Sequence, residues 1–268
     1  MPVFLDQIVH STRGKVAATK RTADLRELER RAERHVPRGF RRALEEKIRA
    51  GIAVIAELKK ASPSKGLIRA EFCVEELAAK LEAAGAAALS VLTDEEFFQG
   101  SLENLRLASA AVTVPCLRKD FIVDEFQLLE ARAHSADAVL LIVAALTQTE
   151  LTALALGARS RDLDVLCEVH DESELQLALD AGCDLIGVNT RDLRTFKVDP
   201  QTAFRLAERL PKNVVRVAES GIQSGEDIAR LREAGYQAFL IGESLMRAVS
   251  PGGALRELVA SHEARASS

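Results

Sequence analysis

The feature that most constrains the fold is a repeated pattern: an apolar run ends in polar residues, and a helical segment follows. The first run, residues 52–56, is apolar throughout and rich in branched side chains, which is typical of a strand buried on both faces. Glu57 and Lys59 follow directly and point to one side, because side chains alternate along a strand. The pattern recurs seven more times, which predicts eight strand–helix units.

The other predicted strands are placed by their apolar runs. They span residues 87–94, 114–121, 138–146, 165–170, 185–193, 213–222 and 238–246. Helical segments lie between them, at residues 71–84, 101–111, 124–134, 171–182, 200–209, 224–234 and 251–259, with one more beginning at Thr147. Glycine after a helix and capping residues before one mark several of these boundaries.

Strands that alternate with helices predict a parallel sheet covered by helices. Eight units in roughly 210 residues fit a closed (β/α)₈ barrel. The competing fold is an open, doubly wound sheet, which would gather its polar residues at one switch point. Here polar residues follow nearly every strand, and no G-x-G-x-x-G follows the first one. We therefore predict an α/β fold of the TIM-barrel class.

Residues 1–50 differ from the rest of the chain. Apolar residues in 4–9 occur at helical spacing, and residues 20–49 are highly charged, with arginine in excess and breaks at Pro37 and Gly39. One interpretation is a basic arm that binds nucleic acid. We favour solvated helices laid across the main domain, because acidic residues are interleaved and aromatic residues are few. This predicts one barrel domain, residues 1–268, with an N-terminal helical extension, residues 1–50, packed on it.

Composition excludes several classes of protein. A net charge of −4 gives no general attraction to nucleic acid or an anionic membrane. No apolar run approaches the ~20 residues of a membrane span, and the N-terminus lacks a cleavable signal pattern. The four cysteines lie far apart, with no C-x-x-C, which favours buried free thiols over a disulfide or zinc framework. We expect a soluble, cytoplasmic protein.

In a barrel, all strand carboxyl ends face one mouth, and residues there carry function. The inward lysine of the third strand, Lys119, lies between apolar neighbours Leu117 and Phe121. Burial and the nearby Lys59 are expected to lower its pKa toward the range useful for proton transfer. A structural ion pair is the alternative for any one of these charges. The strand ends supply Glu57, Lys59, Lys119, Glu168, Asn189, Arg191, Glu219, Ser220, Gly242 and Glu243.

The last two units resemble an anion site. Residues 220–222 and 241–244 each bring a glycine to a strand end, where backbone N–H groups can approach a ligand. The loops after strands seven and eight form the usual phosphate site of such barrels, and Lys59 or the loop after it could add positive charge. The alternative is that these glycines only make tight turns.

Two further patterns are weaker. Glu168 and His170 share one strand face and could be a metal pair, but no third ligand is apparent, so we favour a solvated loop histidine and no metal. Phe98 and Phe121 could wall an aromatic substrate, although core packing explains them equally well.

The segments ELKKASPSKG, LRKDF, CEVH, GVNTRDL, AESGI and LIGESLM, taken together, closely resemble the indole-3-glycerol-phosphate synthase family. The resemblance covers nearly the whole chain, including an N-terminal helical extension. E-x-K-x-x-S-P-S-x-G followed by R/M-K-D-F is its most specific part, whereas the glycine-containing phosphate loops occur in many barrels.

The resemblance implies a reaction and the residues that perform it. The substrate, 1-(2-carboxyphenylamino)-1-deoxyribulose 5-phosphate, would become indole-3-glycerol phosphate, carbon dioxide and water, with no cofactor. Lys119 would be the general acid. The other implied catalytic residues are Glu168, Glu57, Lys59 and Asn189. The implied substrate-binding residues are Ser62, Phe98, Phe121, Leu140, Arg191, Leu193, Glu219, Ser220, Gly221, Gly242 and Glu243, with Arg191 facing the anthranilate carboxylate.

Other functions stay open at this stage. A Schiff-base aldolase could use Lys59 or Lys119 as its nucleophile. A sugar-phosphate isomerase of the same barrel class needs an acid/base pair but no paired lysines. A non-catalytic binder of phosphorylated metabolites could use residues 1–50 as a partner or RNA arm. We favour the synthase, acting as a monomer on a small phosphorylated substrate, with no nucleic-acid or membrane partner.

Overall fold

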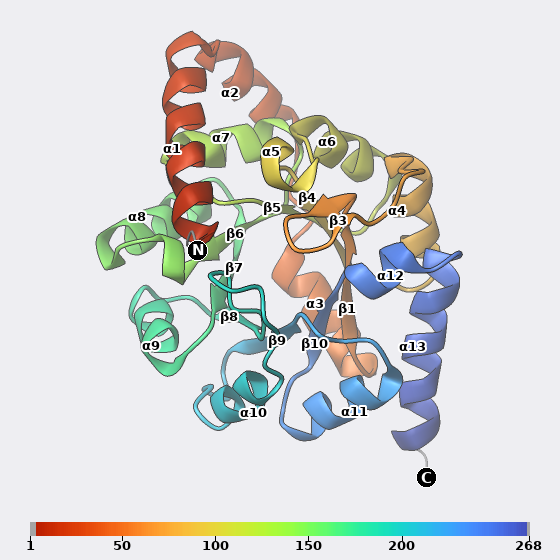
Figure 1. Ribbon diagram of the computed structural model, residues 1–268. Coiled ribbons are helices and arrows are strands. Elements are labelled where there is room, and N and C mark those ends of the chain that lie inside the picture. The colour runs from red at the N-terminus through yellow and green to blue at the C-terminus, as the bar shows by residue number, and fades with distance from the viewer. Residues whose placement is uncertain (1–3, 267–268) are drawn as a thin grey trace.

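Eight parallel strands close into a barrel in the computed structural model, which describes residues 4–266 (Figure 1). Around the barrel the order is β1, β10, β9, β8, β7, β6, β5 and β4, and β4 pairs again with β1. These strands are β1 (Ala53–Leu58), β4 (Ala88–Leu92), β5 (Cys116–Lys119), β6 (Ala138–Ile142), β7 (Asp164–Val169), β8 (Leu185–Asn189), β9 (Val215–Glu219) and β10 (Ala238–Ile241). The closed barrel confirms the predicted fold and excludes the open sheet.

Helices surround the barrel and connect successive strands. They are α4 (Val74–Ala83), α5 (Glu95–Phe98), α6 (Leu102–Ala111), α7 (Glu125–Ala133), α8 (Gln148–Arg159), α9 (Glu172–Asp180), α10 (Gln201–Ala207), α11 (Gly225–Glu233), α12 (Glu243–Arg247) and α13 (Pro251–Ala266). At Thr147, where a helix was predicted to begin, a capping box is present: the Thr147 hydroxyl accepts from the Glu150 amide and the Glu150 carboxylate accepts from the Thr147 amide. A small hairpin of β2 (Ala61–Ser62) and β3 (Gly66–Leu67) follows β1.

Several strands end earlier than the apolar runs predicted. After β6, residues 143–145 turn into the short 3₁₀ helix η1 (Val143–Ala145), and after β10 the helix α12 begins at Glu243. In both places the apolar run continues, but the chain leaves the sheet to build the mouth of the barrel. Apolar character alone does not mark where strand pairing stops.

Side-chain alternation divides the core into two parts. On β5, Leu117 points into the barrel and belongs to an inner cluster with Leu140 and Leu166. Its neighbour Cys116 belongs to the outer cluster, which fills the space between the sheet and the surrounding helices. The strands are therefore apolar on both faces, and their inward positions lead directly to the mouth.

The N-terminal extension forms three helices, α1 (Phe4–Thr22), α2 (Leu25–Arg34) and α3 (Phe40–Ala50). Phe40 and Leu44 of α3 are fully buried in the inner cluster beside the first residues of the strands, such as Ala53, so α3 closes the amino end of the barrel. The break between α2 and α3 falls at the predicted Pro37 and Gly39.

The first helix is longer than the predicted segment at residues 4–9. Leu5 and Ile8 are buried against the inner cluster, whereas the side chain of Phe4 lies outside the described part of the chain. Ion pairs then tie the polar face of α1 to other elements of the fold. They are Arg13–Glu150 at 2.9 Å, Lys15–Glu96 at 2.8 Å and Lys20–Asp124 at 3.0 Å. These three ion pairs join α1 to the segments around α5, α7 and α8.

Among the described residues, 4–266, no helix is long and apolar enough to cross a membrane.

Candidate active site

Three buried side chains meet at the centre of the barrel mouth. Lys119 ends β5, Glu168 lies near the end of β7, and Glu219 ends β9. The Lys119 ammonium donates to Glu168 Oε2 at 2.9 Å and to Glu219 Oε2 at 3.2 Å. Both carboxylates are almost completely buried. The predicted convergence of strand ends is therefore present, with one cation held between two acidic side chains.

The predicted direction of the Lys119 pKa is wrong. Burial lowers this pKa, but the charges of Glu168, Glu219 and Glu57 outweigh burial, and the net result is a pKa well above the ordinary value. The sequence argument counted the apolar neighbours and Lys59 and missed the carboxylates that the barrel brings alongside. Lys119 is thus held in its protonated form.

The two carboxylates respond differently to the same lysine. Burial raises the pKa of Glu168, but the charges of Lys119 and His170 lower it to about 2. Burial and the charge of Glu168 raise the pKa of Glu219 to about 8, against the opposing effect of Lys119. Glu219 therefore holds a proton near neutral pH while Glu168 is ionised, so this site pairs a carboxylic acid with a carboxylate.

A second pair lies beside the first. Lys59 donates to Glu57 Oε1 at 3.1 Å, and the Ser90 hydroxyl donates to Glu57 Oε2 at 3.4 Å. Glu57 and Lys59 face the same side, as the strand alternation predicted.

Two glycines provide the space for these carboxylates. A Cβ on Gly187 of β8 would collide with Glu219 Oε1, and a Cβ on Gly242 would lie 2.5 Å from Glu57 Oε1. Any side chain at either position would push the acid out of place. Gly242 was assigned only to phosphate, and Gly187 was not singled out from the sequence, although a glycine inside an apolar strand indicates a close approach.

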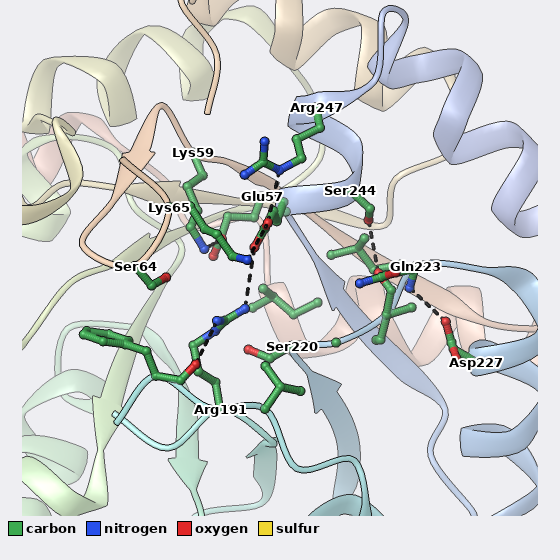
Figure 2. A pocket seen from close by; sticks show the side chains of 18 of the residues that line it. Glu57, Lys59, Ser64, Lys65, Arg191, Ser220, Gln223, Asp227, Ser244 and Arg247 are labelled. Carbon is green, nitrogen blue, oxygen red and sulfur yellow. Dashed lines mark hydrogen bonds and ion pairs between the residues drawn. The ribbon is translucent and has the colours of Figure 1, made fainter. Parts of the chain in front are cut away.

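The outer part of the mouth is a cavity of about 1030 Å³ lined by basic side chains (Figure 2). Lys59, Lys65, Arg191 and Arg247 line it, together with backbone of the loops after β9 and β10. Ser220 and Gly221 both have positive φ, 67° and 76°, a backbone conformation that turns successive N–H groups toward an anion. The arrangement suits a phosphate group.

Glu243 occupies the middle of these cations. Its carboxylate lies 3.1 Å from Arg247 Nε, 3.6 Å from Arg191 Nη2 and 4.0 Å from Lys65 Nζ. The prediction for Glu243 was a backbone contact with phosphate, and the structure adds a side chain that neutralises the same cations. The Arg191 guanidinium accordingly lies at this end of the site, and its assignment to the anthranilate carboxylate stays a prediction.

The inner part of the mouth is a smaller cavity of about 90 Å³, bounded by both apolar and ionisable groups. The rings of Phe98 and Phe121 lie 6.2 Å apart, centroid to centroid, and Leu140 and Leu193 also border the cavity. Predicted residues that line it are Glu57, Lys59, Ser62, Phe98, Lys119, Phe121, Leu140, Glu168, Asn189, Arg191, Leu193, Glu219, Ser220 and Glu243. Gly221 and Gly242 line the outer cavity instead. All sixteen predicted residues thus border one continuous mouth, while their roles remain predictions.

His170 is not the solvated loop histidine that we favoured. Its side chain is 15% exposed and lies between two carboxylates, with Nδ1 2.9 Å from Glu174 Oε2 and Nε2 3.5 Å from Glu168 Oε1. Within the described residues, no group of three or more His, Cys, Asp or Glu side chains could hold a metal ion.

A closed (β/α)₈ barrel with a buried acid–base cluster and a cation-lined cavity at its carboxyl ends belongs to the class of barrel enzymes that act on small anionic substrates. Comparison with known proteins narrows this class. The family model described as "Indole-3-glycerol phosphate synthase" matches residues 5–258. The chain belongs to this family of enzymes.

Individual relatives agree. The chain is 63% identical to the indole-3-glycerol phosphate synthase of Koribacter versatilis (strain Ellin345) over 259 residues, which cover 97% of this chain and 100% of that protein. It is 50% identical to the synthase of Bordetella pertussis (strain Tohama I), covering 92% and 95% of the two chains. A solved 3-hexulose-6-phosphate synthase shares only the fold, with a TM-score of 0.63 at 14% identity over 78% of this chain and 99% of that one.

Proposed function

We propose that this chain is a carbon–carbon lyase that closes the indole ring of tryptophan biosynthesis. Its substrate would be 1-(2-carboxyphenylamino)-1-deoxyribulose 5-phosphate, and its products indole-3-glycerol phosphate, carbon dioxide and water. The observation that carries the proposal is the position of Lys119, whose charged ammonium contacts the buried side chains of Glu168 and Glu219 and lines the inner cavity, next to the cation-lined outer cavity.

Ring closure needs a proton donor at the ribulose C2 carbonyl, because the attacking ring carbon drives negative charge onto that oxygen. Lys119 supplies an ammonium group in a water-poor site, where a charged donor stabilises the developing oxyanion strongly. Glu168, which is ionised before substrate binds, stabilises the cationic intermediate or takes part in proton transfer. Decarboxylation then restores the aromatic ring.

Loss of the C2 hydroxyl as water again needs an acid and a base. The Glu57–Lys59 pair lies next to the first cluster and holds one group of each kind. We assign this pair to dehydration and to substrate positioning. Asn189 and Glu219 would hold the sugar hydroxyls, and the acidic form of Glu219 can donate a hydrogen bond there.

Binding divides the mouth between the two ends of the substrate. The phosphate would lie in the outer cavity, on the backbone of Ser220, Gly221, Gly242 and Glu243. The anthranilate ring would lie against Phe98 and the other apolar residues of the inner cavity, Phe121, Leu140 and Leu193, with Ser62 and Arg191 between the two ends. No cofactor is needed for these steps.

A Schiff-base aldolase is less well supported. Its nucleophile must be a neutral amine, whereas the carboxylates around Lys119 hold this side chain in its charged form. Borohydride with a sugar phosphate should therefore leave the protein unmodified.

We further propose that the enzyme acts as a monomer in the cytoplasm. The site is complete within one chain, and Cys116, Cys167 and Cys183 are buried free thiols, which suits a reducing compartment.

The decisive experiment follows indole fluorescence after purified protein is mixed with the carboxyphenylamino-deoxyribulose phosphate in the presence of a chelator. We expect a steady rise in emission from the wild-type protein and none from Lys119→Met. A flat trace from folded wild-type protein that still binds the substrate would overturn the proposal in favour of a binding protein.

A further inference from the structure

Two buried polar atoms face each other without a partner near the catalytic cluster. Among the described residues, neither Glu168 Oε1 nor His170 Nε2 has a hydrogen-bond partner, although both are inaccessible to solvent. They lie 3.5 Å apart. Buried polar atoms are rarely left unpaired in native structures, and a proton shared between these two would satisfy both. The other oxygen of Glu168 already accepts from Lys119.

The opposite side of the imidazole is fixed. His170 Nδ1 lies 2.9 Å from Glu174 Oε2, and the same oxygen accepts from the His170 backbone amide at 2.8 Å. Because these two bonds anchor the ring, its Nε2 must point at Glu168. The result is a continuous chain, Glu174–His170–Glu168–Lys119, that ends at the group proposed to protonate the substrate.

This row of four side chains leads from Lys119 away from the substrate mouth. Neither His170 nor Glu174 lines the two cavities of the mouth; both line a separate cavity of about 250 Å³, with Leu193 and Ala144 on its wall. Other ionisable groups that face this side cavity are Asp171, Asp192 and Arg194. Solvent in the side cavity can therefore reach His170 and Glu174 when substrate fills the mouth.

The proposed reaction needs a proton from outside. The substrate carboxylate leaves as neutral carbon dioxide and the hydroxyl leaves as neutral water, so charge balance requires that one proton be taken up in each turnover. The C–C bond to the carboxyl group breaks and its electron pair neutralises the cationic ring. The former carbonyl oxygen takes up two protons before it leaves as water, and the ring gives back only one, so one proton must come from solvent. A bound substrate blocks the direct route from the mouth.

We propose that His170, positioned by Glu174, supplies this proton through Glu168, and that the side cavity reloads it from solvent. The inference rests on the proposed function. In the step, His170 Nε2–H passes its proton to Glu168 Oε1, and Glu168 returns a proton to Lys119 after Lys119 has protonated the carbonyl oxygen. His170 acts through Glu168 and is a positioning residue rather than a catalytic one.

Electrostatics supports this role. Burial lowers the pKa of His170, but the hydrogen bond to Glu174 and the charges of Glu168, Glu174 and Glu219 outweigh burial and raise it above its ordinary value. The imidazole therefore binds its proton more tightly than an ordinary histidine does. As pH rises through this pKa, the stored proton is lost and turnover should fall.

The test compares the wild-type protein with His170→Gln, which keeps a hydrogen-bond donor toward Glu168 but cannot titrate. We expect kcat at neutral pH to fall about 10²-fold with KM changed less than threefold, and the alkaline limb of the kcat–pH profile to change, because the imidazole no longer contributes to it. Glu174→Gln should shift this limb to lower pH, because the imidazolium loses a stabilising charge. Gln176→Glu, on the same helix, is a matched control that should behave as wild type.

His170→Ala provides a second readout, because it leaves room beside the side cavity for a small proton donor. Added imidazole should raise the kcat of this variant at least tenfold, and the increase should be larger below neutral pH than above it. A His170→Gln enzyme within twofold of wild type at every pH would overturn the proposal. So would a slow variant whose pH profile is unchanged and that imidazole does not rescue, since this pattern indicates a structural role. A wild-type protein without activity would instead refute the proposed function.

Discussion

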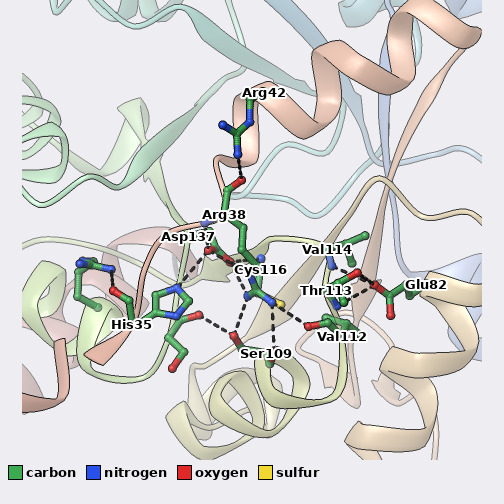
Figure 3. A network of polar contacts seen from close by, with 12 residues as sticks. His35, Arg38, Arg42, Glu82, Ser109, Val112, Thr113, Val114, Cys116 and Asp137 are labelled. Atoms are coloured by element: carbon green, nitrogen blue, oxygen red, sulfur yellow. Dashed lines mark hydrogen bonds and ion pairs between the residues drawn. The ribbon is translucent and has the colours of Figure 1, made fainter. Parts of the chain in front are cut away.

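Two clusters of buried charge lie at opposite ends of the barrel, and they differ in how completely their polar atoms are paired. At the amino end, the Asp137 carboxylate is fully buried and each of its oxygens accepts at least two hydrogen bonds (Figure 3). The donors to Oδ1 include the Arg38 amide at 2.7 Å and His35 Nε2 at 3.1 Å. Those to Oδ2 include Arg38 Nη2 at 2.6 Å and the Cys116 amide at 2.7 Å.

The Arg38 guanidinium is equally well paired. It also donates to the carbonyls of Ser109 and Val112, at 3.2 and 3.0 Å, and to the Ser109 hydroxyl at 2.7 Å. This cluster joins the segment before α3 to the end of α6 and the starts of β5 and β6. It ties the N-terminal extension to the barrel, and the hydrogen bonds to both Asp137 oxygens occupy the carboxylate fully.

The mouth cluster is left incomplete. Of the four buried side-chain atoms without a partner among the described residues, three belong to Glu168, His170 and Glu219. Burial removes hydration from the charges of both clusters, yet only the mouth cluster has spare hydrogen-bonding capacity. From this difference we infer that a buried charge whose polar atoms are all hydrogen-bonded stabilises the fold. A buried charge with unbonded polar atoms is available to bind a substrate.

The largest effect should come from removing the cation of the mouth. Lys119→Met is expected to lower kcat at least ~10³-fold, because it removes the ammonium proposed to protonate the carbonyl oxygen. Binding of a substrate-like phosphate should change little, since the outer cavity stays intact. Steady-state kinetics and a phosphate-ligand titration measure the two. Lys80→Met, an exposed substitution on α4, is the control, and turnover retained by Lys119→Met would refute the role.

The matching change at the amino end should act on stability alone. Asp137→Asn leaves the Arg38 charge buried without its partner, which typically costs ~3–5 kcal/mol of unfolding free energy. Denaturant unfolding at pH 7 measures the loss, with the exposed Asp180→Asn as control. At a temperature where the variant stays folded, its kcat should equal that of wild type. A tenfold fall in kcat from folded protein would contradict the separation of the two clusters.

Opposite pH dependences should separate the clusters further. Burial raises the Asp137 pKa, but its bonds to His35 and Arg38 lower it overall, so its contribution to stability is present above the ordinary carboxyl pKa and is lost as pH falls through the folded value. The Glu219 pKa is instead raised, from 4.5 to about 8. Its contribution is complete below pH 4.5 and is lost as pH rises toward about 8.

Glu219→Gln should therefore remove a loss of stability that wild type suffers on the alkaline side. We expect the variant to equal wild type near pH 4.5 and to exceed it at pH 9, with the difference growing between these values. Denaturant unfolding at pH 5, 7 and 9 measures this. A variant less stable than wild type at pH 9 would show that the Glu219 carboxylate is satisfied in the folded protein, as Asp137 is.

The sequence could predict which residues reach the mouth, because strand alternation and the end of each apolar run are local properties. Glu57, Lys119 and Glu219 lie where those rules put them. The pairing between strands could not be predicted in the same way. The direction of the Lys119 pKa depends on Glu168 and Glu219, which are 49 and 100 residues away along the chain, and only the register of the closed barrel brings them within reach.

The cluster of Asp137 and Arg38 could not be predicted from the sequence either, because its members are far apart along the chain. Arg38 lies in a region where arginine is in excess, and its partner Asp137 is 99 residues further on; nothing local distinguishes it from its exposed neighbours. Gly187 and His170 left faint local signals, a glycine inside a strand and a histidine two residues after a carboxylate. Both needed the structure to show what they contact.

The smallest effect on function should come from replacing Glu243, whose carboxylate pairs with the cations of the outer cavity. Its ion pairs with Arg191, Arg247 and Lys65 hold the cations in place but compete with an incoming phosphate. Glu243→Ser keeps the backbone amide proposed to bind phosphate and frees these cations. We expect inorganic phosphate to bind about five- to tenfold more tightly, ~1 kcal/mol, as befits partly exposed ion pairs.

Isothermal titration at low ionic strength measures this affinity, and the gain should shrink with added salt, because salt screens the freed charges. Glu226→Gln, which also removes one negative charge from the nearby surface, controls for the change in net charge. Weaker phosphate binding by Glu243→Ser would mean that the carboxylate organises the cations instead of competing for them. In that case the charges of the outer cavity would hold the local structure, as the charges of Asp137 and Arg38 do at the amino end.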